Sequence, residues 1–174
     1  MKTILTTITI SILVIAAIAG AGYWFIQDFS SNDAEEISAI AEQIEERKGS
    51  GTAAEASSTE STKDDSDADM KEGKLQTYLH QMTHQKIVAA KKIGAVEMTD
   101  KNIGNMLKIV RENREYYEHG DFYEETLMAW EEGDFSNAVS VHNTIWNWHG
   151  GTVGRATGLM SAEQEQEFVE DKFR

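Results

Sequence analysis

The chain has 174 residues and contains neither cysteine nor proline. Without cysteine there is no disulfide, no thiolate metal ligand, no thiol nucleophile and no lipid attached through a cysteine. Without proline, every turn has to be made with glycine, asparagine, aspartate or serine. The absences exclude disulfide-stapled and thiol-dependent proteins, and they leave histidine and carboxylate side chains as the candidate metal ligands.

Basic residues are also few, and the net charge is −14. Residues 28–72 carry 14 acidic and 4 basic side chains, a net charge of −10, whereas residues 73–174 carry −5. Because no basic patch or stripe is present, we expect no nucleic-acid partner. The acidic stretch is expected to be repelled by anionic lipids and envelope polymers, and so to hold the following domain away from them.

Charged residues are missing altogether from residues 4–26, whose last four residues include a tyrosine, a tryptophan and a phenylalanine. About 20 apolar residues span a bilayer, and aromatic side chains favour its interfaces. We therefore predict a transmembrane helix over residues 4–26 that contacts the lipid bilayer. A cleaved signal peptide is the alternative, because residues 17–19 form an acceptable cleavage site, although apolar residues continue beyond it.

The flanking charges set the expected orientation of this span. Lys2 is the only basic side chain before it, and the first one after it is Arg47. The positive-inside rule then leaves residues 1–3 in the cytoplasm and the rest of the chain outside. The sequence thus predicts a single-pass protein of the cell membrane with an extracytoplasmic C-terminal domain.

Two segments lie between the span and that domain. In residues 27–48, the isoleucines at 37, 40 and 44 have the spacing of a short amphipathic helix. Residues 49–73 consist mainly of Ser, Thr, Ala, Glu and Asp, so we predict a disordered acidic linker with a reach of roughly 25 to 30 Å.

Residues 74–174 have the apolar spacing of helices, without a run of alternating strand residues. We predict an all-α, bundle-like domain of four to five short helices. The expected helices cover about 74–92, then from Thr99 to Gly120, about 121–132, about 136–149, and from Ser161 onward. Thr99 is the expected N-cap of the second helix, and Ser161 with Gln164 forms a capping box. Gly94 is expected at the C-cap of the first.

The stretch 134–161 joins a helix dense in His, Asn and Trp to a loop with four glycines. Its candidate binding residues are His142, Asn143, Trp146, His149, Gly150, Gly151, Thr152, Gly154, Arg155, Thr157 and Gly158. One interpretation is that this loop binds a carboxylate, a sugar or a peptide terminus. The other is structural: tryptophans in the core, His142 and Asn143 bonded to the loop backbone, glycines at positive φ, and Arg155 paired with an acidic neighbour. No nucleotide-binding glycine motif is present.

Histidine spacing suggests a metal site as an alternative. A helix presents two imidazoles four residues apart on one face, and a third ligand can come from a neighbouring helix. The candidate ligands are His80 and His84, with His142 or His149 as the third. A carboxylate such as Glu112 or Glu131 could complete the set. Gln81 stands where the zinc metalloprotease motif has glutamate, so that motif is absent.

Several short segments resemble a known group of proteins: residues 82–86, 98–99, 130–136, 142–146 and, most specifically, the Gly-Gly-Thr-Val-Gly-Arg-Ala-Thr-Gly block. They are similar to uncharacterised, membrane-anchored proteins of Bacillus-type Gram-positive bacteria, over roughly residues 75 to 174. The resemblance implies an extracytoplasmic helical domain of unknown function behind an N-terminal anchor, and it carries no activity.

The sequence favours a binding domain over an enzyme. No nucleophile constellation is apparent, since Ser136 and Ser161 are better explained as helix caps. We expect a membrane-anchored helical domain that contacts an envelope protein, peptide or polymer through the 142–158 region, with no cofactor. The alternative is a small metal-dependent envelope enzyme or metal sensor that uses the histidines.

Overall fold

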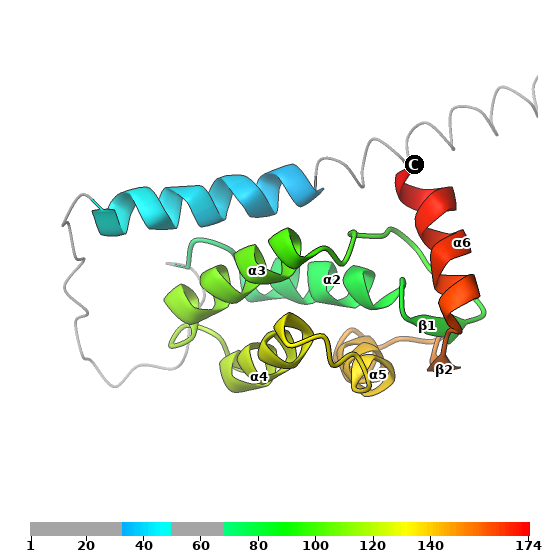
Figure 1. Ribbon diagram of the computed structural model, residues 1–174. Helices are drawn as coiled ribbons and strands as arrows, with labels where there is room; N and C mark the ends of the chain where they lie inside the picture. The colour runs from blue at the N-terminus through cyan, green and yellow to red at the C-terminus, as the bar shows by residue number, and fades with distance from the viewer. Residues whose placement is uncertain (1–32, 50–67) are drawn as a thin grey trace, which may run out of the picture.

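The computed structural model describes residues 33–49 and 68–174, and these form a mostly helical domain (Figure 1). Its elements are a helix over residues 33–49, α2 (Glu72–Thr83), β1 (Ile87–Ala89), α3 (Asp100–Asn113), α4 (Gly120–Glu131), α5 (Ala138–Trp148), β2 (Ala156–Leu159) and α6 (Ala162–Phe173). The predicted membrane span and most of the predicted linker lie outside the described residues. Within the described part, no helix is long and apolar enough to cross a bilayer.

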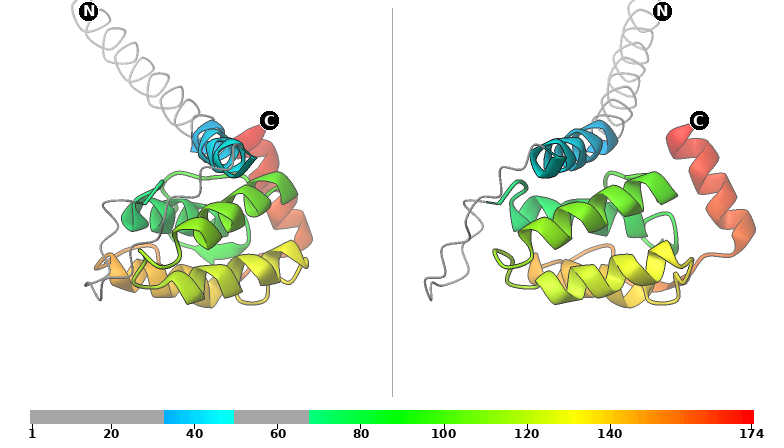
Figure 2. Two further views of the ribbon diagram at one scale, coloured as in Figure 1. Left: turned by 90° about the vertical axis from the view of Figure 1, so that its left-hand side faces the viewer. Right: turned by 60° about the vertical axis from the view of Figure 1, so that its left-hand side comes forward.

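The helices are arranged in layers (Figure 2). α3 packs against α4 and α2 against α5, while helix 33–49 lies across α2 and α3. α3 shows why the sequence folds this way, because Ile103, Met106, Leu107 and Val110 lie on one face and are all buried. They join one apolar core whose bulkiest member is Trp130.

The predicted helix starts are confirmed where a local cap determines them. The Thr99 hydroxyl accepts a hydrogen bond from the Asn102 N–H (3.1 Å), so α3 begins at Asp100. Ser161 and Gln164 form the predicted capping box at the start of α6. Each cap satisfies N–H groups that have no partner within the helix.

Helix 33–49 belongs to the domain core. Ile37, Ala41 and Ile44 are 0–2 % exposed and are members of the same apolar cluster as α2 and α3. The sequence predicts this helix as a separate segment in front of the domain, because the apolar spacing of so short a helix does not show what it packs against. Its apolar face is stabilised by packing instead.

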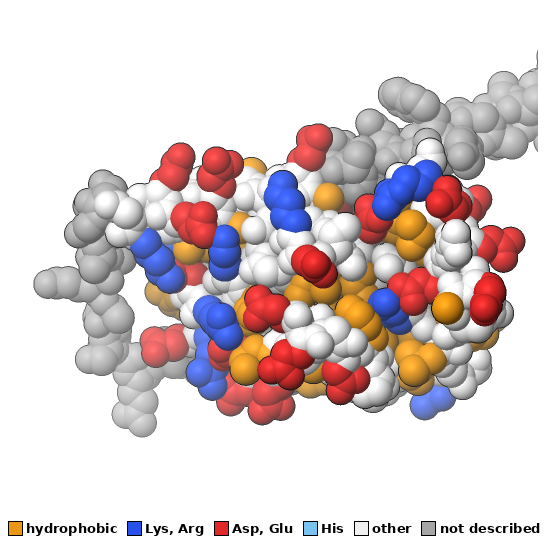
Figure 3. Space-filling view, in the orientation of Figure 1, with side chains coloured by type: hydrophobic (Ala, Val, Ile, Leu, Met, Phe, Trp, Pro, Cys, Tyr) orange, Lys and Arg blue, Asp and Glu red, His pale blue; other side chains and the backbone are white. Residues whose placement is uncertain are grey.

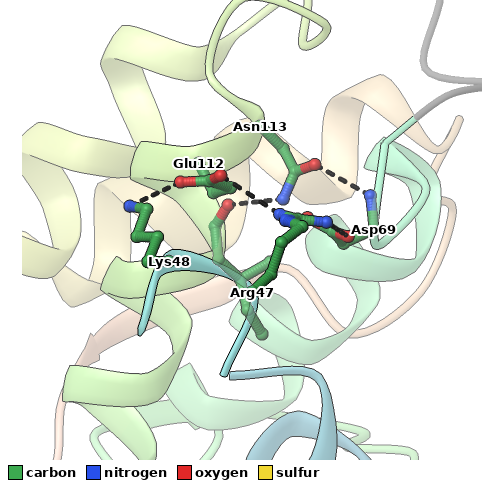
Figure 4. A network of polar contacts seen from close by, with 6 residues as sticks. Arg47, Lys48, Asp69, Glu112 and Asn113 are labelled. Atoms are coloured by element: carbon green, nitrogen blue, oxygen red, sulfur yellow. Dashed lines mark hydrogen bonds and ion pairs between the residues drawn. The ribbon is translucent and has the colours of Figure 1, made fainter. Parts of the chain in front are cut away.

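A polar network fixes the C-terminal end of helix 33–49 (Figure 4). Both terminal nitrogens of Arg47 donate to the carboxylate of Asp69 (2.8 and 3.0 Å), and one also reaches Glu112 at 3.1 Å. Lys48 pairs with Glu112, and the Asn113 side chain accepts from the Asp69 N–H at 2.8 Å. The network therefore brings the two chain positions on either side of residues 50–67 into direct contact.

Ion pairs elsewhere on this side are exposed, and Figure 3 shows acidic and basic side chains interspersed over helix 33–49 and α3. Lys74 pairs with Glu36, and Lys108 pairs with Glu45. Exposed pairs of this kind contribute about 1 kcal/mol or less each. The apolar core, rather than these charges, holds helix 33–49 in place.

The prediction of a first helix over about 74–92 is wrong, because α2 ends at Thr83. The Thr83 hydroxyl lies 2.5 Å from the His80 carbonyl oxygen, and the Lys92 ammonium donates to the His84 carbonyl (2.8 Å). These side chains occupy carbonyls that have no partner at a helix end. The chain then turns into β1.

The domain also contains a small antiparallel sheet that the sequence analysis did not predict. Ile87 pairs with Leu159 and Val88 with Gly158, and the register shifts after Val88. Ile87 is buried and Val88 is exposed, which is the alternation expected of a strand with one face covered. Three residues were too few to reveal this alternation in the sequence.

Two glycines have roles other than those predicted. Gly94 has a φ of +73° but lies in the loop after β1, not at a helix C-cap. Gly120 begins α4, whereas α3 already ends at Asn113. In both cases the preceding helix stops earlier than its apolar spacing indicates.

Candidate metal centre

Three of the four candidate metal-ligating histidines converge where α2 packs against α5. His80 and His84 lie at the C-terminal end of α2, and His142 lies on α5. One ring nitrogen from each lies within 4.8 Å of the others. The fourth candidate, His149, is not part of this cluster, and its Nε2 lies 2.7 Å from Oε1 of Gln76.

The three rings touch one another. The His80 and His142 rings are stacked with centroids 4.1 Å apart, while His84 lies 4.9 Å from His80 and 5.4 Å from His142. In a tetrahedral site with bonds of about 2.0 Å to the metal, ligand nitrogens are about 3.3 Å apart. The ring nitrogens therefore have to move closer together than 4.8 Å to bind one ion.

Hydrogen bonds already orient two of the rings. Nδ1 of His84 lies 2.8 Å from the Gly94 carbonyl oxygen, so Nδ1 carries the proton and Nε2 keeps a lone pair. Nδ1 of His142 lies 2.9 Å from the Thr83 hydroxyl. Nδ1 of His80 is buried and has no hydrogen-bond partner among the described residues. This unpartnered ring nitrogen, beside two oriented imidazoles, is available as a ligand atom.

Thr83 and Gly154 give His142 two alternative proton arrangements. Nε2 of His142 lies 3.1 Å from the Gly154 carbonyl oxygen, which can only accept. If Nε2 donates to it, the hydroxyl of Thr83 must donate to Nδ1. If instead Nδ1 donates to Thr83, the hydroxyl is free to donate to the His80 carbonyl and Nε2 has a lone pair. A cation bound at Nε2 stabilises the second arrangement.

Burial keeps all three imidazoles neutral at pH 7. It lowers the pKa of His80 to about 3, with a smaller effect from the neighbouring His142 and His84. It lowers the pKa of His84 to about 4, against the opposing effect of the bond to Gly94, and it lowers that of His142 as well. Neutral imidazole is the form that binds metals, so no proton has to leave before an ion enters.

A pocket gives access to the cluster from one side. Its volume is about 300 Å³, and its lining consists of Thr77, His80, Gln81, Ile93, Trp146, His149 and Gly151. Gly151 forms one wall against the Trp146 ring, where any Cβ atom would collide with the indole. The half-buried His80 thus connects a buried cluster with the surface.

The profile of a family of unknown function (DUF6241) matches residues 79–170, more than half of the chain. The chain belongs to this family. The matched region includes the three cluster histidines and the glycine loop, but not helix 33–49 or most of α2. Neither the curated proteins nor the solved structures contain a match to the chain.

Within the DUF6241 region, most candidate binding residues hold the glycine loop. Asn143 bonds both backbone groups of Ala156 (2.9 and 3.1 Å), and Trp146 donates to the Val153 carbonyl at 2.9 Å. Gly150 and Gly154 have φ of +64° and +93°, and Thr157 donates to the Val88 carbonyl. These contacts agree with the structural interpretation, in which Asn143 bonds to the loop backbone and glycines of the loop have positive φ.

The remaining candidates in the DUF6241 loop point to no ligand. Thr152 and Arg155 are exposed, and Gly158 lies in β2. Arg155 makes no ion pair within residues 33–49 and 68–174, so the expected acidic partner is not found there. A contact surface at residues 142–158 stays a prediction.

Neither predicted carboxylate joins the histidines. Glu112 is occupied by the Arg47 network, and in the described part of the chain the cluster contains imidazoles only. Sequence reasoning missed Thr83 and the Gly94 carbonyl, which orient two of the rings. No pattern could have revealed them, since their role depends on how α2 packs against α5 and on the course of the following loop.

Proposed function

We propose that this protein binds one divalent transition-metal ion, Zn²⁺ in the first place, through His80, His84 and His142. The observation that supports the proposal most directly is the approach of three ring nitrogens to within 4.8 Å of one another. Imidazole ligands suit Zn²⁺, Cu²⁺ and Ni²⁺, whereas Mg²⁺ and Ca²⁺ prefer oxygen.

The surroundings of the rings support the same proposal. Metal-binding histidines typically donate their second N–H to a carbonyl or hydroxyl oxygen, which fixes the tautomer. The Gly94 carbonyl takes this place for His84, and the Thr83 hydroxyl takes it for His142. Three protein ligands leave a fourth coordination position open, as in catalytic or exchanging zinc sites rather than closed structural ones.

Metal binding in this geometry acts on the glycine loop. An ion on Nε2 of His142 replaces the hydrogen bond to the Gly154 carbonyl, because that nitrogen cannot donate a proton and bind a cation at once. The loop then loses one of its attachments to α5. The predicted contact surface and the metal site are thereby linked, with the loop as the segment that responds to the ion.

We further propose that the domain is displayed outside the cell membrane, in the cell envelope. The uncharged residues 4–26 support an anchor in the lipid bilayer, and the single basic residue before them supports the orientation. In that location the domain would meet extracytoplasmic metal ions.

Calorimetric titration tests the metal site. The full chain, purified in detergent and stripped with a chelator, is expected to bind one Zn²⁺ per chain. His80→Ala, His84→Ala and His142→Ala should each weaken binding by about 100-fold or more, and Thr83→Val by about tenfold or more. His119→Ala is the matched control, since His119 lies outside the cluster and should leave binding unchanged.

Either of two results would contradict the proposal. One is the absence of stoichiometric Zn²⁺ in a chain that is folded by circular dichroism. The other is equal Zn²⁺ affinity in the His142→Ala and His119→Ala variants, which would move the binding site away from the cluster.

A further inference from the structure

His149 lines the pocket beside His80 but does not belong to the histidine cluster. It follows the last residue of α5, and its side chain is exposed. Its Nε2 lies 2.7 Å from Oε1 of Gln76, a residue of α2. One helix thus supplies both His80 of the cluster and the residue that orients His149.

The direction of the hydrogen bonds behind His149 is fixed by a carboxylate. Tyr123 donates its only hydroxyl proton to Glu72 (2.7 Å), so its oxygen accepts from Nε2 of Gln76, also at 2.7 Å. This sets the Gln76 amide with Oε1 toward His149, and Oε1 can only accept. Nε2 of His149 therefore carries the proton, which leaves a lone pair on Nδ1.

Nδ1 of His149 has no hydrogen-bond partner among the described residues. A histidine held by one nitrogen, with the other free to accept a proton at a pocket, is the arrangement of a general base and the group that orients it. The chain from Glu72 through Tyr123 and Gln76 supplies that orientation.

The lining of the pocket indicates the class of substrate. Ile93 and Trp146 give it apolar walls, Thr77 and Gln81 are polar but uncharged, and no lysine or arginine is present to bind an anion. A volume of about 300 Å³ lies at the small end of ligand pockets. The pocket therefore suits a small uncharged molecule.

We infer that the metal-loaded protein hydrolyses small uncharged carboxylic esters or amides in this pocket, with His149 as the general base. The inference rests on the proposed metal site, whose open coordination position would hold a water molecule. His149 lines the same pocket as His80, and we assign it the role of accepting a proton from that water.

The reaction balances with water as the only co-reactant. The metal-bound water gives a proton to Nδ1 of His149, and its oxygen forms a bond to the carbonyl carbon while the metal polarises the carbonyl oxygen. The tetrahedral adduct then breaks its bond to the alcohol or amine. The leaving group takes the proton from His149, and the acid remains.

Hydrolysis of 4-nitrophenyl acetate by the full chain in detergent tests this inference. The Zn²⁺-loaded chain should hydrolyse the ester faster than the chelated chain, and faster than free Zn²⁺ at the same concentration. His149→Ala should lower kcat/KM by about 100-fold or more, with Zn²⁺ affinity by calorimetry within twofold of the original chain. His119→Ala is the control and should change neither quantity.

Gln76→Ala probes the positioning role of Gln76. It should lower kcat with little change in KM, because an unoriented His149 is a poorer base. A second readout does not depend on turnover. In the Co²⁺-loaded chain, the visible spectrum should titrate with the bound water, and His149→Ala should shift that titration.

The outcomes separate the two proposals. Zn²⁺ binding without hydrolysis above free Zn²⁺ would overturn this inference and leave the metal site standing, whereas absence of Zn²⁺ binding would overturn both. Hydrolysis that is unaffected by His149→Ala would remove His149 from the reaction. Faster hydrolysis of 4-nitrophenyl phosphate than of the acetate would overturn the substrate class.

Discussion

At the scale of single residues, the His80–His84–His142 cluster keeps three titratable groups uncharged in an apolar setting. His84 and His142 are 1 % exposed, so protonation of either ring would place a charge in a buried position. The His84 ring bonds one carbonyl and the His142 ring one hydroxyl and one carbonyl, and the Lys92 ammonium lies close by, on the His84 carbonyl oxygen. This favours an ion that neutral nitrogen can bind, and it makes the metal-free domain sensitive to acid.

Acid should destabilise the metal-free protein before its carboxylates titrate. In the unfolded chain the histidines titrate near 6.5, whereas the folded-state pKa is about 3 for His80 and about 4 for His84. The free energy of unfolding is therefore highest above pH 6.5. It falls as the pH decreases toward 4, because in this range only the unfolded chain takes up protons. Between pH 7 and pH 5 each should remove about 2 kcal/mol from the free energy of unfolding.

Urea unfolding of the chelated protein at pH 7, 6 and 5 measures this loss. His84→Gln should reduce the dependence of the free energy of unfolding on pH by about the contribution of one histidine. A free energy of unfolding that stays constant between pH 7 and pH 5 would show that the cluster is accessible to protons in the folded state.

Gly151 and Gly158 offer a matched pair for the close packing of the glycine loop. A Cβ atom at Gly151 would collide with the Trp146 ring, whereas one at Gly158 would meet no heavy atom within 4 Å. Neither glycine has a positive φ, so the comparison isolates the steric effect. Gly151→Ala should cost about 1 to 3 kcal/mol of stability, and Gly158→Ala should be nearly neutral. Equal melting temperatures for the two variants would contradict this packing.

At the scale of elements, helix 33–49 should contribute to stability like any core helix. Ile37 is fully buried, while Ile40, on the same helix, is only partly buried against the core. Ile37→Ala should cost about 2 to 5 kcal/mol because it leaves a cavity, and Ile40→Ala clearly less. Thermal unfolding of the two variants checks this order. A helix that merely rests on the surface would give two small and similar losses.

The elements that the sequence predicted correctly are those fixed by neighbouring residues. α3 and α6 begin at caps whose donor and acceptor lie three residues apart, so Thr99 and Ser161 identified them. The end of α2 was missed because it depends on Thr83, on Lys92 and on strand pairing with residues about 70 positions away. Apolar spacing alone continues the helix through this region.

The candidate site shows the same limit. Spacing of four residues identified His80 and His84 as a pair, because that relation is internal to one helix. His142 and His149 could not be separated as the third ligand, since the choice depends on how far along α5 the two helices meet. The sequence also left the loop residues open between binding and structure, and in the structure Asn143 and Trp146 donate hydrogen bonds to the loop backbone.

At the scale of the whole molecule, we expect that residues 50–67 do not set the distance between the predicted membrane span and the domain. Helix 33–49 precedes them in the chain and is already part of the core, and Arg47 bonds directly to Asp69. Only residues 27–32 separate the predicted span from the described domain. The expected role of the acidic stretch as a spacer is therefore not supported by the contacts of the residues on either side of it.

Shortening residues 50–67 by half should leave the fold, the metal affinity and the distance to the bilayer unchanged. Halving the segment lowers the entropy cost of bringing its two ends together on folding, which should raise stability by about 0.6 kcal/mol. Urea unfolding measures that gain, and energy transfer from Trp residues to a headgroup-labelled lipid, in vesicles, measures the distance. Inserting the same number of residues after position 28 is the matched control, and it should reduce the transfer. If the deletion, rather than the insertion, changes the transfer, residues 50–67 do act as the spacer and helix 33–49 must leave the core in the membrane-bound protein.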